Sequence, residues 1–330
     1  MRLRISAGMI ATLLCLLPGC AMRPIAARQV ISSMGVEGGR LPLTAVLEVI
    51  REEENEIITV QGNNFTELFS AAEQQSGEPL YLGALQSIVF SGVPDGSTLQ
   101  EYLRMLLADG RIAPNTQIAL CQDVQALYGG GVTGDEITAL LTRQYTDSCS
   151  NGLKELVNRL EGDGRDGLLV WLSAEEDQLR EAGAVPTGSS DYTALWQPED
   201  LFRLLLGQCS EIRFSLPVGE GEAAVLLRQL SVSGVAFEKE GKEPRVTLLA
   251  EATVQAADGT FSRQQLAAAL QQDLQQRLAA FNREMARSHS DLLGLRTRAR
   301  LSGIIPEEIS FAETRYDLRL VLRDPRGLLP

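Results

Sequence analysis

The clearest pattern of apolar positions lies in the last quarter of the chain. Large apolar residues recur there at steps of three or four, the spacing of one helix face: Leu266, Leu270, Leu274, Leu278, Phe281 and Met285. Ser262 followed by Gln265 is the pattern of a capping box and places the start of this helix. The apolar face must be buried. Burial against the sheet of the same domain is the simplest solution, and a coiled-coil partner helix is the alternative, although the spacing lacks a strict heptad.

The first half of the chain alternates between strand and helix patterns. Runs of β-forming residues occupy 28–35, 41–50, 57–60, 80–90, 116–121 and 168–172. Helical spacing occupies 64–76, 98–108, 137–144 and 153–160. The expected capping pairs are Asn64 with Glu67, Thr98 with Glu101 and Thr133 with Glu136. This alternation predicts a mixed α/β domain in which helices flank a sheet.

The second half combines one short helix with strands. The helix is expected at 199–206, and strand patterns follow at 211–216, 223–237, 245–255 and 316–322. Hairpins are the economical connection, so we expect an antiparallel sheet packed by the long helix, an α+β domain. Glycine, proline and serine residues at 181–200 indicate a linker or a reduced middle domain. The predicted organisation is a signal peptide at 1–19, an N-terminal α/β domain at 20–180, this linker, and a C-terminal domain at 201–330.

The first twenty residues have the pattern of a secretory signal. Two arginines precede an apolar run from Met9 to Leu17, which is shorter than the roughly 20 residues that a membrane-spanning helix needs. An aliphatic residue, two small residues and a cysteine form the lipid-attachment box of bacterial lipoproteins; Gly19 and Cys20 fit this box, and Pro18 departs from it. We therefore expect cleavage before Cys20 and lipidation of its thiol, which anchors the body at the outer face of a membrane. A plain secretory signal is the alternative.

Charge argues against nucleic acid as a partner. The formal net charge is −13, from 43 acidic and 30 basic residues. An acidic surface is repelled by phosphate backbones, and no basic cluster in the sequence reverses the charge locally. We expect no nucleic-acid binding.

The sequence offers few groups for catalysis or metal binding. Cys121, Cys149 and Cys209 are widely spaced and form no C-x-x-C pair, so we expect buried free thiols, with one disulfide as the alternative. The single histidine, His289, is expected to cap a helix end. No G-x-S-x-G or H-E-x-x-H motif is present. We therefore expect no enzymatic activity, no metal site and no cofactor.

Three short motifs have functional alternatives that the surrounding sequence disfavours. Residues 129–134 match G-x-G-x-x-G, but no strand pattern precedes them, so a loop is expected. Residues 161–167 have the composition of a calcium loop without the acid spacing of an EF-hand. The acidic run at 52–56 is expected at a solvated hairpin tip, with a metal-binding cluster as the alternative.

Several segments resemble the C-subunit lipoproteins of spore germinant receptors. Residues 83–93, 99–104 and 118–120 resemble that family's succession of a strand, a glycine-containing turn, a helix carrying an arginine and a further strand. Residues 290–295 resemble the segment that follows the family's long C-terminal helix, and residues 315–323 its closing strand. The residues just after Cys20 depart from the family, which usually has a Trp-Asp pair there.

This resemblance implies a non-catalytic, lipid-anchored receptor subunit on the outer surface of the inner spore membrane. Its partners would be two multi-spanning receptor subunits, and the response to germinant would depend on it. Whether a small-molecule ligand touches this subunit stays open. A lipid-anchored solute-binding protein of a transporter and a structural envelope lipoprotein are the alternatives.

Overall fold

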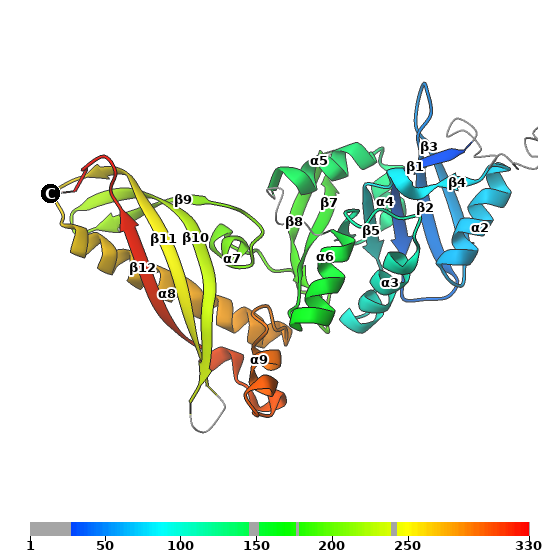
Figure 1. The fold of residues 1–330 in the computed structure, drawn as a ribbon. Coiled ribbons are helices and arrows are strands. Elements are labelled where there is room, and N and C mark those ends of the chain that lie inside the picture. The colour runs from blue at the N-terminus through cyan, green and yellow to red at the C-terminus, as the bar shows by residue number, and fades with distance from the viewer. Residues whose placement is uncertain (1–27, 145–151, 176–177, 239–242, 330) are drawn as a thin grey trace, which may run out of the picture.

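The computed structural model describes residues 28–144, 152–175, 178–238 and 243–329, which form two parts, each built on its own sheet (Figure 1). We call them the N-terminal and C-terminal domains. The predicted signal peptide, the lipidation residue Cys20 and Cys149 lie outside the described residues.

The N-terminal domain is built on an eight-stranded sheet of order β3-β2-β1-β5-β6-β7-β8, with β4 paired to β1 beside this path. β1, β5, β6 and β7 run parallel, whereas β2, β3 and β8 join antiparallel at the two sides. The strands are β1 (Gln29–Glu37), β2 (Leu43–Val49), β3 (Glu56–Gly62), β4 (Leu80–Tyr81), β5 (Ser87–Ser91), β6 (Gln117–Cys121), β7 (Leu168–Glu175) and β8 (Gln178–Pro186).

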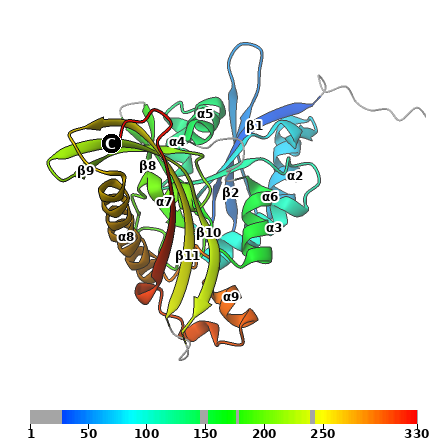
Figure 2. The ribbon, with the colours of Figure 1, turned by 60° about the vertical axis from the view of Figure 1, so that its left-hand side comes forward.

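Helices cover both faces of this sheet (Figures 1 and 2). One face carries α2 (Phe65–Ser76), α3 (Gly96–Ala108) and α6 (Leu153–Asn158), and the other carries α4 (Val124–Gly129) and α5 (Gly134–Gln144). Successive strand residues point to opposite faces, so Ile88 and Phe90 lie in the core under α2 and α3, and Val89 lies in the core under α4 and α5. The mixed α/β fold class is confirmed.

The helix caps follow the sequence at α2 and α5 and depart from it at α3. Asn64 accepts a hydrogen bond from the Glu67 N–H, as predicted. The predicted capping box at Thr98 is wrong, because α3 begins at Gly96 and Asp95 Oδ1 accepts from the Thr98 N–H at 2.8 Å. Aspartate caps a helix at least as well as threonine, and it precedes the first helical residue here.

The C-terminal domain has a four-stranded sheet of order β12-β11-β10-β9. Its elements are α7 (Asp200–Leu205), β9 (Ile212–Val218), β10 (Gly221–Phe237), β11 (Pro244–Asp258), α8 (Arg263–Ser288), α9 (Leu295–Leu301) and β12 (Arg315–Arg323). β9, β10 and β11 pair antiparallel, but β12 pairs parallel to β11, so the expectation of a wholly antiparallel sheet is wrong. α8 carries the chain back along the sheet, and β12 therefore starts beside the start of β11.

The long helix α8 lies across this sheet (Figure 1). The capping box of Ser262 and Gln265 is present. All six apolar residues of the predicted face are fully buried, in one core with side chains of β10 and β11. The interpretation as a helix buried in its own domain is confirmed, and the helix face has no room for a coiled-coil partner.

The region between the domains begins with part of a strand, where the sequence predicts a linker or a reduced middle domain. β8 extends to Pro186, so the first six residues of the expected linker belong to the N-terminal sheet. Gly183 and Glu181 lie opposite the consecutive residues Trp171 and Leu172, which marks a β-bulge at Ala182. Gly183 lies beside this bulge, and a glycine inside a strand is easily mistaken for a turn when only the sequence is considered. Leu195 packs on the N-terminal core and Leu201 lies in the C-terminal core, and we propose the domain boundary between them.

Candidate functional site at the junction between the domains

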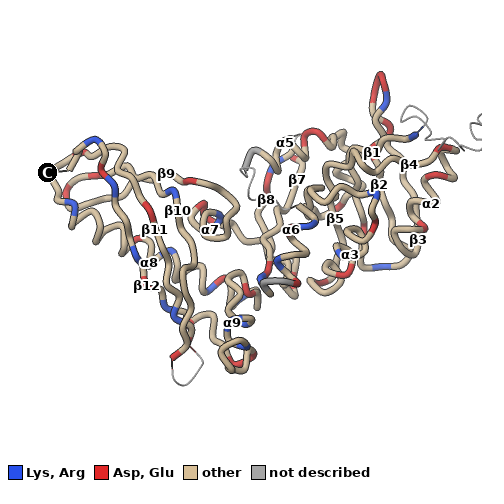
Figure 3. Tube along the Cα trace, in the orientation of Figure 1, with Lys and Arg blue, Asp and Glu red and all other residues tan. Residues whose placement is uncertain are grey.

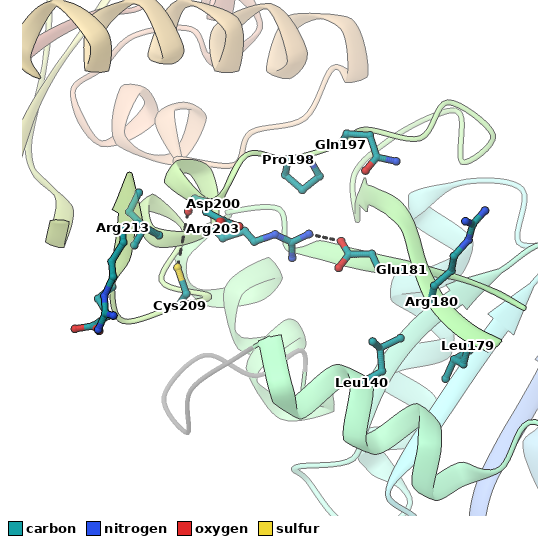
Figure 4. A pocket seen from close by; sticks show the side chains of 12 residues that line it. Leu140, Leu179, Arg180, Glu181, Gln197, Pro198, Asp200, Arg203, Cys209 and Arg213 are labelled. Atoms are coloured by element: carbon teal, nitrogen blue, oxygen red, sulfur yellow. Dashed lines mark hydrogen bonds and ion pairs between the residues drawn. The ribbon is translucent and has the colours of Figure 1, made fainter. Parts of the chain in front are cut away.

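A cleft of about 800 Å³ lies where the two domains meet (Figure 4). α5 and β8 provide lining residues from the N-terminal domain, and α7 and β9 provide them from the C-terminal domain. Charged side chains of both signs line the cleft: Arg180, Arg203, Arg213, Glu181, Asp200 and Glu211. Its position between two domains is typical of binding sites.

An ion pair joins the domains beside this cleft. Arg203 of α7 bonds Glu181 of β8, and the two side chains are only 9% and 13% exposed. Gln208, which follows α7, donates from Nε2 to the carbonyl of Leu168 at 2.9 Å in a second buried contact. Removing one member of a buried ion pair leaves the other charge uncompensated, so this pair helps to fix how the domains are placed.

A third contact between the domains joins two aspartates. Asp166 precedes β7, and Asp291 follows α8. Asp166 Oδ2 accepts from the Asp291 N–H at 2.6 Å, and the Asp166 N–H donates to the Asp291 carbonyl at 3.0 Å. The Asp291 carboxylate also accepts from the N–H groups of Leu295 and Arg296, the first residues of α9. Burial raises the pKa of both aspartates, and the nearby Asp291 charge adds to this effect at Asp166.

Trp196 connects the segment between the domains to both of them. Its N–H donates to the carbonyl of Ala184 in β8 at 2.9 Å, and its carbonyl accepts from the Ala184 N–H at 2.7 Å. Its ring stacks on Phe202 of α7 with centroids 5.5 Å apart and lies 5.9 Å from Phe281 of α8. The backbone of Trp196 thus extends the N-terminal sheet while its side chain joins the C-terminal core.

The charges of the cleft are largely paired. Arg180 bonds Glu175, Arg203 bonds Glu181, and Arg213 lies 3.3 Å from Glu211. The cleft can therefore form hydrogen bonds with a binding partner. A charged partner could also replace one member of an existing ion pair. In the part of the chain that the structure describes, no group of three or more His, Cys, Asp or Glu side chains is placed to hold a metal ion. Among the described helices, none has the length and apolarity to cross a membrane.

The candidate residues from the sequence do not gather at this junction, with one exception. Cys20 and Cys149 lie outside the described residues. Cys121 is buried at the end of β6, and burial raises the pKa of its thiol to about 12, which makes it unreactive. Cys209 is the exception, since it lines the cleft with its Sγ 3.8 Å from the Asp200 carbonyl. His289 ends α8 in a left-handed conformation, at the predicted helix end.

The three weak motifs lie in loops or turns. Residues 130–133 connect α4 to α5, and a helix rather than a strand precedes them. The acidic run is exposed and spans the turn between β2 and β3 up to Glu56, the first residue of β3, as expected for a hairpin tip. Residues 159–163 form one helical turn, and Gly164 follows in a left-handed conformation before β7.

Sequence reasoning missed the residues that join the domains. Asp291 belongs to the segment that resembles the receptor family, so the sequence marks its position but not its partner. Asp166 sits in a glycine-rich turn, where an acidic residue is ordinary. Glu181 and Arg203 lie 22 positions apart in different elements, and no local pattern connects them.

The fold defines a two-domain class: a mixed sheet with helices on both faces, followed by a smaller sheet packed by one long helix. The structure is similar to the crystal structure of the GerBC protein, with a TM-score of 0.55 and 10% sequence identity, over 91% of this chain and 99% of that chain. For the fold, this likeness confirms the resemblance to germinant receptor C-subunits. No protein-family model and no curated protein matches the sequence.

Proposed function

We propose that this chain is a divergent C-subunit of a spore germinant receptor, a non-catalytic lipoprotein on which the response to germinant depends. The observation that carries the proposal is the likeness to GerBC, which extends over both domains and nearly the whole length of that chain. The family segments in the sequence and the lipoprotein signal support it independently.

In this proposal the lipid on Cys20 holds the domains at the outer face of the inner spore membrane. The first described strand, β1, begins at Gln29, so a short segment separates the anchor from the folded body. Anchoring confines the body to a thin layer and raises its effective concentration near multi-spanning receptor subunits. The subunit then acts by contact with these partners.

The arrangement of the domains supports this function over that of a solute-binding protein. Solute-binding proteins have two similar α/β lobes around a ligand, whereas here an eight-stranded α/β domain is followed by a four-stranded sheet with a single long helix. Thermal-shift screening with amino acids and sugars separates the two classes. Tight binding of such a solute by this chain would favour the transporter class.

Two experiments test the proposal. Spores that lack this chain should fail to respond to germinant, and normal germination of these spores would refute the role. Incorporation of radiolabelled fatty acid should be lost in Cys20→Ala and retained in Cys15→Ala, a matched change within the predicted signal. Labelling that survives Cys20→Ala would refute the anchor.

A further inference from the structure

One edge of the C-terminal sheet is open to a further strand. β12 pairs along its nine residues with β11, and no other described strand pairs with it (Figure 1). An unpaired edge presents a row of backbone N–H and C=O groups, which pair readily with another chain.

Side chains of α8 occupy two points of this edge. Arg263 donates to the Leu322 carbonyl, and Asn282 donates to the Thr314 carbonyl at 2.7 Å. Backbone groups of successive residues point to alternate edges of a strand, so the even-numbered residues of β12 face the open edge. The residues between the two occupied points are Tyr316, Leu318 and Leu320, and Leu318 is their midpoint.

Four of the five odd-numbered residues of β12 are charged and exposed, namely Arg315, Asp317, Arg319 and Arg323, and the fifth is the exposed Val321. Basic positions therefore recur along this strand (Figure 3). Asp317 is half exposed and bonds Arg245 at 2.9 Å. Arg319 is exposed, and among the described residues it has no ion-pair partner. The open edge therefore carries an acid and an available base two residues apart.

We propose that two copies of this chain pair through β12, antiparallel and centred on Leu318. In this register Leu318 lies opposite the partner's Leu318, and Tyr316 lies opposite the partner's Leu320, which gives about six backbone hydrogen bonds. Asp317 lies opposite the partner's Arg319, and the symmetry repeats this pair. Both ion pairs fall at non-hydrogen-bonded positions, where opposite side chains are closest.

Two features favour this register over registers shifted by one or more residues: the charges that it places opposite one another, and the backbone carbonyls that it leaves free to bond. Centred on Asp317, the pairing sets Asp317 against itself and Arg315 against Arg319. Centred on Arg319, it sets Arg319 against itself and Arg315 against Arg323. Larger shifts bring in Thr314 or Leu322, whose carbonyls are already bonded. Because the strand is complementary to itself, the geometry points to a second copy of the chain.

Charge reversal in the full-length chain tests this dimer, which does not depend on the proposed function. Sedimentation of the wild-type protein up to about 100 µM should show a dimer. Asp317→Arg and Arg319→Asp should each weaken it at least about tenfold, because each sets like charges opposite one another. The double variant D317R/R319D restores opposite charges and should restore the dimer. Glu307→Arg, an exposed reversal away from β12, should leave it unchanged.

Three results would overturn the proposal. These are a monomer at every concentration, a dimer that survives both single reversals, and a double variant that stays monomeric although circular dichroism shows it folded. A monomer that binds an unrelated extended peptide at this edge would assign the edge to another partner.

Cross-linking checks the register separately. In the variant D317C/R319C, the new thiol at position 317 lies opposite the new thiol at position 319 of the other copy. Mild oxidation should therefore link the copies covalently. Asp317→Cys alone faces the partner's Arg319 and should not link them above the background of the wild-type chain. Equal linking in both variants would refute the register.

Discussion

Asp166 and Asp291, 125 residues apart in the chain, form two hydrogen bonds with each other at the junction of the domains: the Asp291 N–H donates to the Asp166 carboxylate, and the Asp166 N–H donates to the Asp291 carbonyl. Asp291 also caps α9, so this one residue both fixes the start of a helix in the C-terminal domain and hydrogen-bonds the N-terminal domain. Both carboxyls are largely removed from water, and this burial raises their pKa. The contact therefore combines good hydrogen-bond geometry with repulsion between two buried charges.

Asp166→Asn should stabilise the protein more at about pH 7.5 than at about pH 4.5. A carboxyl with a raised folded pKa keeps its proton after the unfolded chain has lost its own. Its contribution to stability is full below the unfolded value near 3.8 and is lost as pH rises through the folded pKa. Asparagine stays neutral and avoids this loss, and its side-chain oxygen still accepts from the Asp291 N–H. Urea unfolding at both pH values measures the difference, with exposed Asp258→Asn as control. An effect of equal size at both pH values would contradict the mechanism.

Gly164→Ala should weaken the junction. Gly164 has a φ of 59°, and a Cβ there would lie 2.0 Å from Oγ1 of Thr297 on α9. We expect a loss of about 2–4 kcal/mol in the free energy of unfolding, from backbone strain and the clash together. Gly77→Ala is the matched control, because its φ is 74° and nothing lies within 4 Å of its Cβ position. Urea unfolding of both variants isolates the clash, and equal losses would show that Thr297 yields without cost.

The elements that could be predicted from the sequence are those with a strong local signal. α8 is the clearest case, since its period of apolar residues and its capping box are both local features, and both occur in the structure. The direction of β12 could not be read in this way. The direction of β12 depends on the end of the sheet at which the chain emerges after α8 and α9. That position is set by how α8 packs on the sheet and not by any local pattern.

The junction could not be predicted, because its contacts join positions with no local relation. Ala184 and Trp196 pair across a loop whose glycines and serines are typical of a linker. Asp166 and Asp291 are acids in turns, where acids are usually solvated. Their burial follows from the approach of two separately formed cores, and no pattern within either segment encodes it.

Leu274→Ala should destabilise the C-terminal domain by about 2–5 kcal/mol, because Leu274 is fully buried near the middle of α8 and the variant leaves a cavity. Gln272→Ala is the control on the exposed side of the same helix, and it should change stability by less than about 0.5 kcal/mol. Circular dichroism during urea unfolding measures both. A small effect at Leu274 would mean that α8 packs more loosely on the sheet than its burial indicates.

Arg203→Ala should destabilise the protein by about 3–5 kcal/mol, because Glu181 is left in a largely buried site without its cation. The double variant R203M/E181L removes both charges and fills a similar volume, so it should recover most of this loss. Urea unfolding of the single and double variants gives their coupling free energy directly. If the double variant is as unstable as Arg203→Ala, the junction depends on other contacts of Arg203, and the ion pair with Glu181 does not hold the domains together. If it recovers, the pair is replaceable by apolar contact, and the junction depends on shape at this point rather than on charge.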